Sequence, residues 1–158
     1  MPGILQRAHA HQGASFVEIY TNCIVYNDGA FSSFAEKSTA ADGELVLEHG
    51  QPMIFGQDRD KGIRMKPGAI ELEVVQLGVD GVTEADLLCH DETNRVLAGL
   101  LGAMHNPEFP VAVGVLYCED AEAYDTAVYQ QVDAARAADG VADINTLLRS
   151  GATWTVGD

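Results

Sequence analysis

Residues Gly13–Phe31 read GASFVEIYTNCIVYNDGAF, and this stretch decides the predicted fold. Within it, Ser15–Tyr20 is dominated by apolar side chains interrupted by Glu18, a pattern typical of a strand covered on both faces in a parallel sheet. Cys23 follows this strand, and the Asn-Asp-Gly run at 27–29 favours a tight turn. A thiol at the carboxyl end of such a strand lies where α/β proteins hold ligands, and the alternative interpretation of Cys23 is a small buried thiol with a structural role.

The segments that flank this strand suggest how it is placed. Ile4, Leu5 and Ala8 have helical spacing, and Gly13 ends the pattern, so we expect the end of a helix whose start is absent from this sequence. A parallel strand needs a neighbour, and Val111–Tyr117 (VAVGVLY) is the one later segment that is as apolar. We predict that it pairs with Ser15–Tyr20.

The remaining elements follow from periodicity and turn residues. A short helix is expected at 30–37 and a loop at 38–43. Short strands separated by glycines and prolines are expected at 44–49, 52–55, 61–66 and 70–77. We predict that these strands form a small antiparallel sheet. A further short strand is expected at 85–90. Three helices are expected after it, at 96–104, 121–138 and 145–149. Asp91 is the expected cap of the first of these helices.

Composition narrows the class of protein. The chain has 158 residues, 47% of them hydrophobic and 21% charged, which indicates one globular domain with a core. Its 24 acidic and 9 basic residues give a net charge of −15, so we expect no binding to nucleic acid or to an anionic membrane. No signal peptide and no apolar run of membrane-spanning length is present, and we predict a cytoplasmic location.

The three cysteines (Cys23, Cys89 and Cys118) are far apart and form no C-x-x-C pair, which argues against a zinc site or a disulfide framework. Cys89 and Cys118 lie in or beside apolar segments and are expected to be core thiols. The five histidines lack the spacing of a metal site, and His90-Asp91-Glu92 is interpreted as part of a helix cap. The sequence predicts no catalytic residue.

The block GASFVEIYTNCIVYNDGAF closely resembles a segment of the β subunits of 2-oxoacid:ferredoxin oxidoreductases, especially those of the 2-oxoglutarate type. The resemblance continues through LEHGQPMIFG (47–56), HNPEFPVAVGVLY (105–117) and LLRSGATWTV (147–156), so that it covers nearly the whole chain. It implies the C-terminal portion of such a subunit. The expected fold class is α/β: the C-terminal part of a thiamine-diphosphate-binding fold, with a small antiparallel β region inserted before the last helix-strand-helix.

The resemblance also implies a function. Enzymes of this family decarboxylate a 2-oxoacid on thiamine diphosphate with Mg²⁺, pass the acyl group to coenzyme A, and send electrons through a [4Fe-4S] cluster to ferredoxin. It implies that Cys23 is one of the four cluster ligands, that the other three are absent from this chain, and that an α subunit is a partner. The G-D-G-D-type motif of the thiamine site is also absent, so the chain alone is expected to be inactive.

The predicted organisation has three regions. Residues 1–29 are expected to end the thiamine-binding core with a helix end, a strand and the cysteine loop. Residues 30–90 form a small β-rich region, and residues 91–158 form a helix-strand-helix region. The alternative function is a non-catalytic acidic α/β interaction domain, or a truncated relative of the oxidoreductase subunit.

Overall fold

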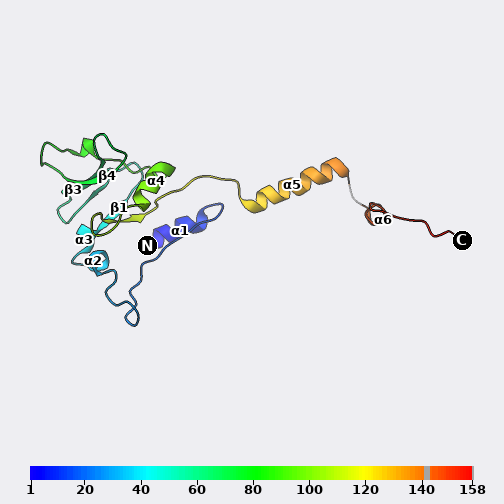
Figure 1. Cartoon of the computed structure of the whole chain (residues 1–158), viewed down its shortest axis with the longest axis horizontal. Coiled ribbons are helices and arrows are strands. Elements are labelled where there is room, and N and C mark those ends of the chain that lie inside the picture. The colour runs from blue at the N-terminus through cyan, green and yellow to red at the C-terminus, as the bar shows by residue number, and fades with distance from the viewer. Residues whose placement is uncertain (141–142, 158) are drawn as a thin grey trace. The chain divides into compact units, whose positions relative to one another are not determined.

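The computed structural model describes residues 1–140 and 143–157. Its internal contacts divide the chain into two units. The first contains Met1–His9 and Phe16–Glu119, and the second contains Ala10–Ser15 and Asp120–Asp158. The sheets and the hydrophobic core all belong to the first unit (Figure 1). The predicted division at residues 29 and 90 stays a prediction.

The first unit begins with helix α1 (Pro2–Ala10), which confirms the helix predicted from the spacing of its apolar residues. Two single-turn helices follow, α2 (Ser32–Ala35) and α3 (Ala40–Gly43). The short helix expected at 30–37 is therefore confirmed, whereas the loop expected at 38–43 is wrong. Thr39 explains the difference, because the backbone N–H groups of Asp42 and Gly43 both donate to its carbonyl oxygen and close a helical turn.

Three strands form the antiparallel sheet predicted for the middle of the chain. They are β2 (Ile54–Phe55), β3 (Lys61–Met65) and β4 (Leu72–Gln76), with β3 in the centre. Their register places Gly62 opposite both Ile54 and Val75. A Cβ atom at Gly62 would lie 2.5 Å from a methyl carbon of the buried Leu87, so glycine is required for this close approach.

A second sheet pairs β1 (Glu44–Leu47) with β5 (Val111–Gly114) in parallel. The strands expected at 44–49 and 111–117 are thus present, although each is shorter than predicted. The expectation that the first of them joins the antiparallel sheet is wrong. Together the two sheets and the helices confirm the predicted α/β class.

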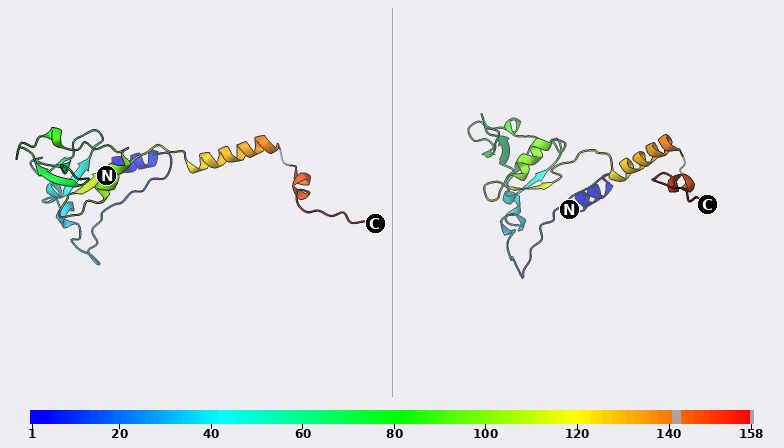
Figure 2. Two further views of the ribbon diagram at one scale, coloured as in Figure 1. Left: turned by 45° about the horizontal axis from the view of Figure 1, so that its top comes forward. Right: turned by 45° about the vertical axis from the view of Figure 1, so that its right-hand side comes forward.

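The strand predicted at Ser15–Tyr20 is wrong, and so is its pairing with Val111–Tyr117. These residues are extended but form no ladder with any described part of the chain. The apolar strand that was expected beside them pairs with β1 instead. As a result Phe16 is 92% exposed, rather than buried between two sheet faces. Figure 2 shows the loop that precedes α2 extending away from the strands of this unit in both views.

The hydrophobic core lies between the two sheets and α4 (Arg95–Gly102). Leu45 of β1 and Ile63 of β3 are fully buried, and α4 contributes two leucines that lie four residues apart, as one face of a helix requires. The buried residues of this cluster are Leu45, Leu47, Met53, Phe55, Ile63, Leu97 and Leu101.

The approach to α4 differs from the prediction in two respects. The strand expected at 85–90 is replaced by the 3₁₀ helix η1 (Glu84–Asp86) and an isolated bridge between Cys89 and Pro52. Asp91 is not the helix cap, because the carbonyl oxygen of the Asn94 side chain accepts from the N–H groups of Val96 and Leu97. Asp91 instead closes a turn with Thr93.

The second unit contains α5 (Tyr124–Asp139) and α6 (Ile144–Leu148), which confirm the two helices predicted there. No described residue between 120 and 157 is buried. The apolar stripe of α5 therefore faces no partner among these residues, with Tyr124 85% exposed. Within residues 1–140 and 143–157, no helix is both long enough and apolar enough to cross a membrane.

Candidate functional site

The loop at residues 22–29 carries Cys23, the one site residue that the sequence predicts. Asn22 closes this loop, because its side-chain nitrogen donates to Asp28 (2.9 Å) and its side-chain oxygen accepts from the backbone N–H of Gly29 (3.0 Å). Gly29 has a φ of 72°, a left-handed conformation that favours glycine. The turn expected from the Asn-Asp-Gly run is therefore present.

Backbone N–H groups surround the cysteine within this loop. The N–H of Asn27 donates to the carbonyl oxygen of Cys23 at 3.0 Å, which brings the chain back over the cysteine. The backbone N–H of Tyr26, followed by those of Val25 and Asn27, lowers the pKa of the Cys23 thiol. Consecutive N–H groups that point at one atom form an anion-binding nest, so this turn favours the thiolate.

The loop is attached to the first unit by an aromatic cluster at its base. The ring of Tyr20 lies 5.2 Å from Phe31 and 5.3 Å from Phe34 between centroids, in edge-to-face arrangements. Phe34 is buried, and its Cα and Cβ leave no room for a side chain at Gly43. This cluster positions the start of the loop, whereas Ile24, Val25 and Tyr26 at its tip are each at least 75% exposed.

A thiolate that receives N–H hydrogen bonds is a suitable ligand for an iron–sulfur cluster. Cys23 fits that chemistry, but such a cluster usually takes four thiolates. Among residues 1–140 and 143–157, no group of three or more His, Cys, Asp or Glu side chains is arranged to hold a metal ion. Cys23 is therefore suited to be one ligand of a cluster whose other ligands lie elsewhere.

The other two cysteines are not the core thiols that the sequence predicts. Cys89 is exposed, and it forms an isolated bridge with Pro52. Cys118 is half-buried, and its backbone N–H donates to the carbonyl oxygen of Glu92. The apolar neighbours of both cysteines contribute to the core, but the cysteine side chains do not.

His90 is a buried polar side chain that the sequence pattern did not reveal. Only 1% of its surface is exposed, and its Nε2 lies 2.8 Å from the carbonyl oxygen of Val115. In the tautomer that donates this bond, Nδ1 is an acceptor, and it has no hydrogen-bond partner among the described residues. The interpretation of His90-Asp91-Glu92 as a helix cap is therefore wrong, since His90 links its own segment to the end of β5.

Glu92, the residue after Asp91, forms an ion pair with Arg7 of α1. Both terminal nitrogens of Arg7 donate to the carboxylate of Glu92, one at 2.8 Å. Arg7, together with the nearby imidazoles of His49 and His90, lowers the pKa of Glu92 against the opposing effect of burial. Arg7 and Glu92 are 85 residues apart in the sequence, so the hydrophobic periodicity of either segment could not have predicted that they pair.

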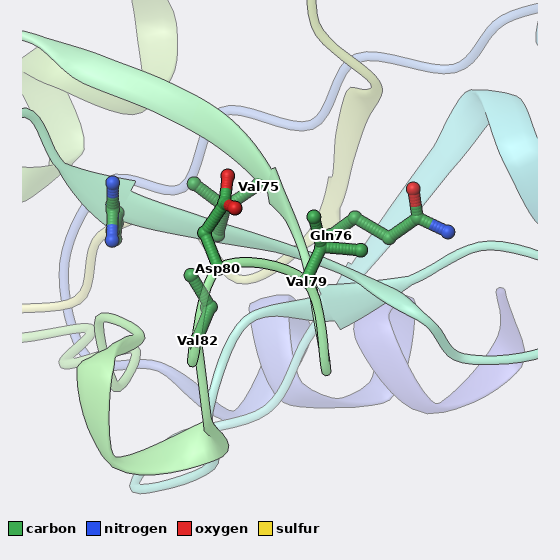
Figure 3. A pocket seen from close by; sticks show the side chains of 6 residues that line it. Val75, Gln76, Val79, Asp80 and Val82 are labelled. Carbon is green, nitrogen blue, oxygen red and sulfur yellow. The ribbon is translucent and has the colours of Figure 1, made fainter.

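A hollow of about 250 Å³ lies between β4 and the turn that follows it (Figure 3). The residues that line it are Arg64, Val75, Gln76, Val79, Asp80 and Val82. The Nε atom of Arg64 already binds Glu73 at 2.6 Å. The Arg64 side chain is thus held by Glu73 within the sheet, and Asp80 is the one carboxylate among the residues that line the hollow.

Comparison with curated proteins identifies a relative of this chain. The chain is 28% identical over 156 residues to the 2-oxoglutarate oxidoreductase subunit KorB of Mycobacterium tuberculosis. This chain resembles an oxidoreductase subunit. The match covers 97% of the chain and confirms the resemblance that the sequence motifs predict.

The length of the match limits which properties of the relative can be inferred for this chain. The chain spans 41% of the length of this curated relative. No family model matches the chain, and no solved structure matches it significantly. The α/β class is consistent with the relative, whereas the role of Cys23 stays a prediction.

Proposed function

We propose that the chain forms part of the β subunit of a 2-oxoacid:ferredoxin oxidoreductase acting on 2-oxoglutarate, in which Cys23 is one of four ligands of a [4Fe-4S] cluster. The single observation that carries this proposal is the Cys23 loop, whose N–H groups lower the thiol pKa. The similarity to KorB along 97% of the chain supports the choice of enzyme class and substrate.

The residues that the chain contains indicate which part of the reaction we assign to it and which part to the rest of the enzyme. When bound to the complete enzyme, thiamine diphosphate with Mg²⁺ supplies decarboxylation, coenzyme A takes the acyl group, and the cluster carries electrons to ferredoxin. Cys23 supplies one thiolate, and the backbone N–H groups of Tyr26 and Val25 favour that form because they lower the pKa of the thiol. The remaining ligands and the cofactor site come from residues outside these 158, and an α subunit completes the complex.

The loop geometry gives each neighbour a role in this proposal. Asn22 holds the two ends of the loop together and so fixes the direction of the Cys23 side chain. Tyr20 ties the loop to the aromatic cluster at α2. The exposed apolar tip at Ile24–Tyr26 would exclude water from a cluster once the rest of the site covers it, and hydrogen bonding and solvent exposure both tune a cluster's potential.

Substitution in the intact complex tests the proposal. Cys23→Ser in a β subunit that contains this chain, co-expressed with its α subunit, is expected to lower iron content and the cluster's electron paramagnetic resonance signal while thiamine diphosphate binding persists. Cys89→Ser is the matched control, because Cys89 is an exposed thiol without an assigned role. Iron content that is the same in both variants would remove Cys23 from the site.

A further inference from the structure

The two sides of the Cys23 loop are joined by contacts in consecutive register. An isolated antiparallel bridge pairs Cys23 with Asn27, and the backbone N–H of Asn27 donates to the carbonyl oxygen of Cys23 at 3.0 Å. One position further from the tip in this register, Asn22 lies opposite Asp28. Side chains make the contact there, because Nδ2 of Asn22 donates to Oδ1 of Asp28 at 2.9 Å. The Asn22–Asp28 contact therefore continues the pairing that the bridge begins.

Asn22 is suited to this position because its amide uses both of its hydrogen-bonding sides. While Nδ2 donates to Asp28, Oδ1 accepts from the backbone N–H of Gly29 at 3.0 Å. An asparagine carries a donor and an acceptor on one planar group, and a carboxylate acceptor makes the stronger kind of hydrogen bond. Alanine at position 22 would lose both contacts, and aspartate would keep the acceptor but repel Asp28.

Side-chain packing does little to hold the rest of this loop. Ile24–Tyr26 are each at least 75% exposed, and the aromatic cluster lies outside the loop, at Tyr20 and Phe31. The backbone N–H groups that act on the Cys23 sulfur belong to residues 25–27, at and beside this exposed tip. Their direction therefore depends on how the two sides of the loop are joined.

We propose that Asn22 and Asp28 together are positioning residues for Cys23: their side-chain contact keeps the loop closed, so that the backbone N–H groups of residues 25–27 stay directed at the sulfur. The inference rests on the proposed function for what binds to that sulfur, whereas the position of the thiol is a property of this chain alone. Hydrogen bonds to the sulfurs help to set the reduction potential of an iron–sulfur cluster. In the complete subunit, the pair thus tunes that potential without touching the cluster.

Alkylation of Cys23 by iodoacetamide in the full chain tests the pair, at high salt to screen the charges. Asn22→Ala is expected to raise the pH midpoint of the reaction toward that of the urea-unfolded chain, since the N–H groups lose their direction. Asn22→Asp/Asp28→Asn exchanges amide and carboxylate at constant net charge and re-forms both contacts, so it is expected to restore the midpoint. Asn145→Ala is the matched control, because the Asn145 amide contacts the Asp143 carboxylate in the second unit.

An unchanged midpoint in Asn22→Ala, or a raised midpoint that the exchange fails to restore, would overturn the proposal. In the complete β subunit co-expressed with its α subunit, Asn22→Ala is expected to keep its iron and to shift the cluster's midpoint potential to more negative values, because N–H donors favour the reduced cluster. An unchanged potential with iron retained would refute the tuning. The proposed function fails by a different result, unchanged iron in Cys23→Ser, and the alkylation midpoints decide the positioning role in either case.

Discussion

At the scale of single residues, the environment of Cys23 has a direct chemical consequence. Its thiol is exposed, and backbone N–H groups of its own loop lower the pKa of the thiol against a smaller opposing effect of desolvation. The largest effect comes from the N–H of Tyr26, ahead of that of Val25. Exposure and thiolate character together make a cysteine reactive toward electrophiles, metals and oxidants.

We therefore predict that Cys23 reacts with iodoacetamide in the folded chain with a pH midpoint below the midpoint measured after unfolding in urea. Tyr26→Pro, which removes the principal N–H donor, is expected to shift the folded midpoint upward. Ile24→Pro is the control, because the Ile24 N–H does not act on the thiol. Mass spectrometry of the Cys23 peptide gives the rates, and identical midpoints in folded and unfolded chains would refute the prediction.

The Arg7–Glu92 ion pair makes the stability of the fold sensitive to acid. Because Arg7 lowers the folded-state pKa of Glu92, the pair stabilises the folded chain above the ordinary glutamate pKa of 4.5 and is lost as the pH falls below it. Glu92→Gln is expected to cost at most about 1 kcal/mol at pH 7, since the Arg7 side chain is half exposed, and to cost less at pH 3.

Urea unfolding at the two pH values measures this difference, and Glu71→Gln is the control. Glu71 also faces a cation, Lys66, but at 3.5 Å with both side chains more than half exposed. An exposed pair of this kind contributes little to stability. Equal losses for the two variants at pH 7 would show that α1 is held by something other than Arg7.

At the scale of elements, two glycines in short helices differ in the space that surrounds their Cβ positions. A Cβ atom at Gly43, the last residue of α3, would lie 2.6 Å from the carbonyl oxygen of Ser33 and 2.7 Å from the Cα of Phe34. These are backbone atoms that cannot move aside. Gly99, within α4, has open space around its Cβ position.

Alanine at the two positions should therefore change stability in opposite directions. Gly43→Ala is expected to lower the free energy of unfolding by roughly 1–3 kcal/mol, because the close approach of α2 and α3 must open. Gly99→Ala is expected to raise it by about 0.5–1 kcal/mol through helix propensity alone. Chemical denaturation measures both, and a neutral Gly43→Ala would mean that α2 and α3 are not closely packed.

The elements also show which features a sequence can predict. Local patterns placed β3, β4 and α5 correctly, since the turns and stripes that define them lie within a few residues. The pairing of β1 with β5 depends on residues more than sixty positions apart, and periodicity carries no information about such a choice. Ser15–Tyr20 was predicted as a buried strand because its apolar composition favours cover on both faces, yet Phe16 within it is 92% exposed.

The candidate site was predictable to the same extent. The turn after Cys23 follows from Asn27, Asp28 and Gly29, which are adjacent in the sequence. The closure by the Asn22 side chain and the amides around the sulfur are three-dimensional features that need coordinates. His90 illustrates the limit most clearly, because a lone histidine beside an acidic pair gives no signal that it is buried.

At the scale of the whole molecule, the two units differ in what stabilises them. The first has a core that includes two fully buried side chains, Leu45 and Ile63. The second has no buried residue among those described between 120 and 157, so the burial of side chains contributes little to the stability of its helices. A helix of the length of α5 is marginal in water without tertiary contacts. Loss of structure in the second unit should therefore be gradual and should precede unfolding of the first.

The single tryptophan makes this difference measurable. Trp154 lies in the second unit and is 85% exposed, so its emission is expected to match that of tryptophan in water and to show no cooperative transition on heating. Trp154→Phe/Phe31→Trp moves the probe into the aromatic cluster beside Phe34, where the emission should be blue-shifted and should report a cooperative transition. A blue-shifted Trp154 whose transition coincides with that of the relocated tryptophan would contradict the prediction, because it would show that residues of the second unit are packed and unfold cooperatively with the first.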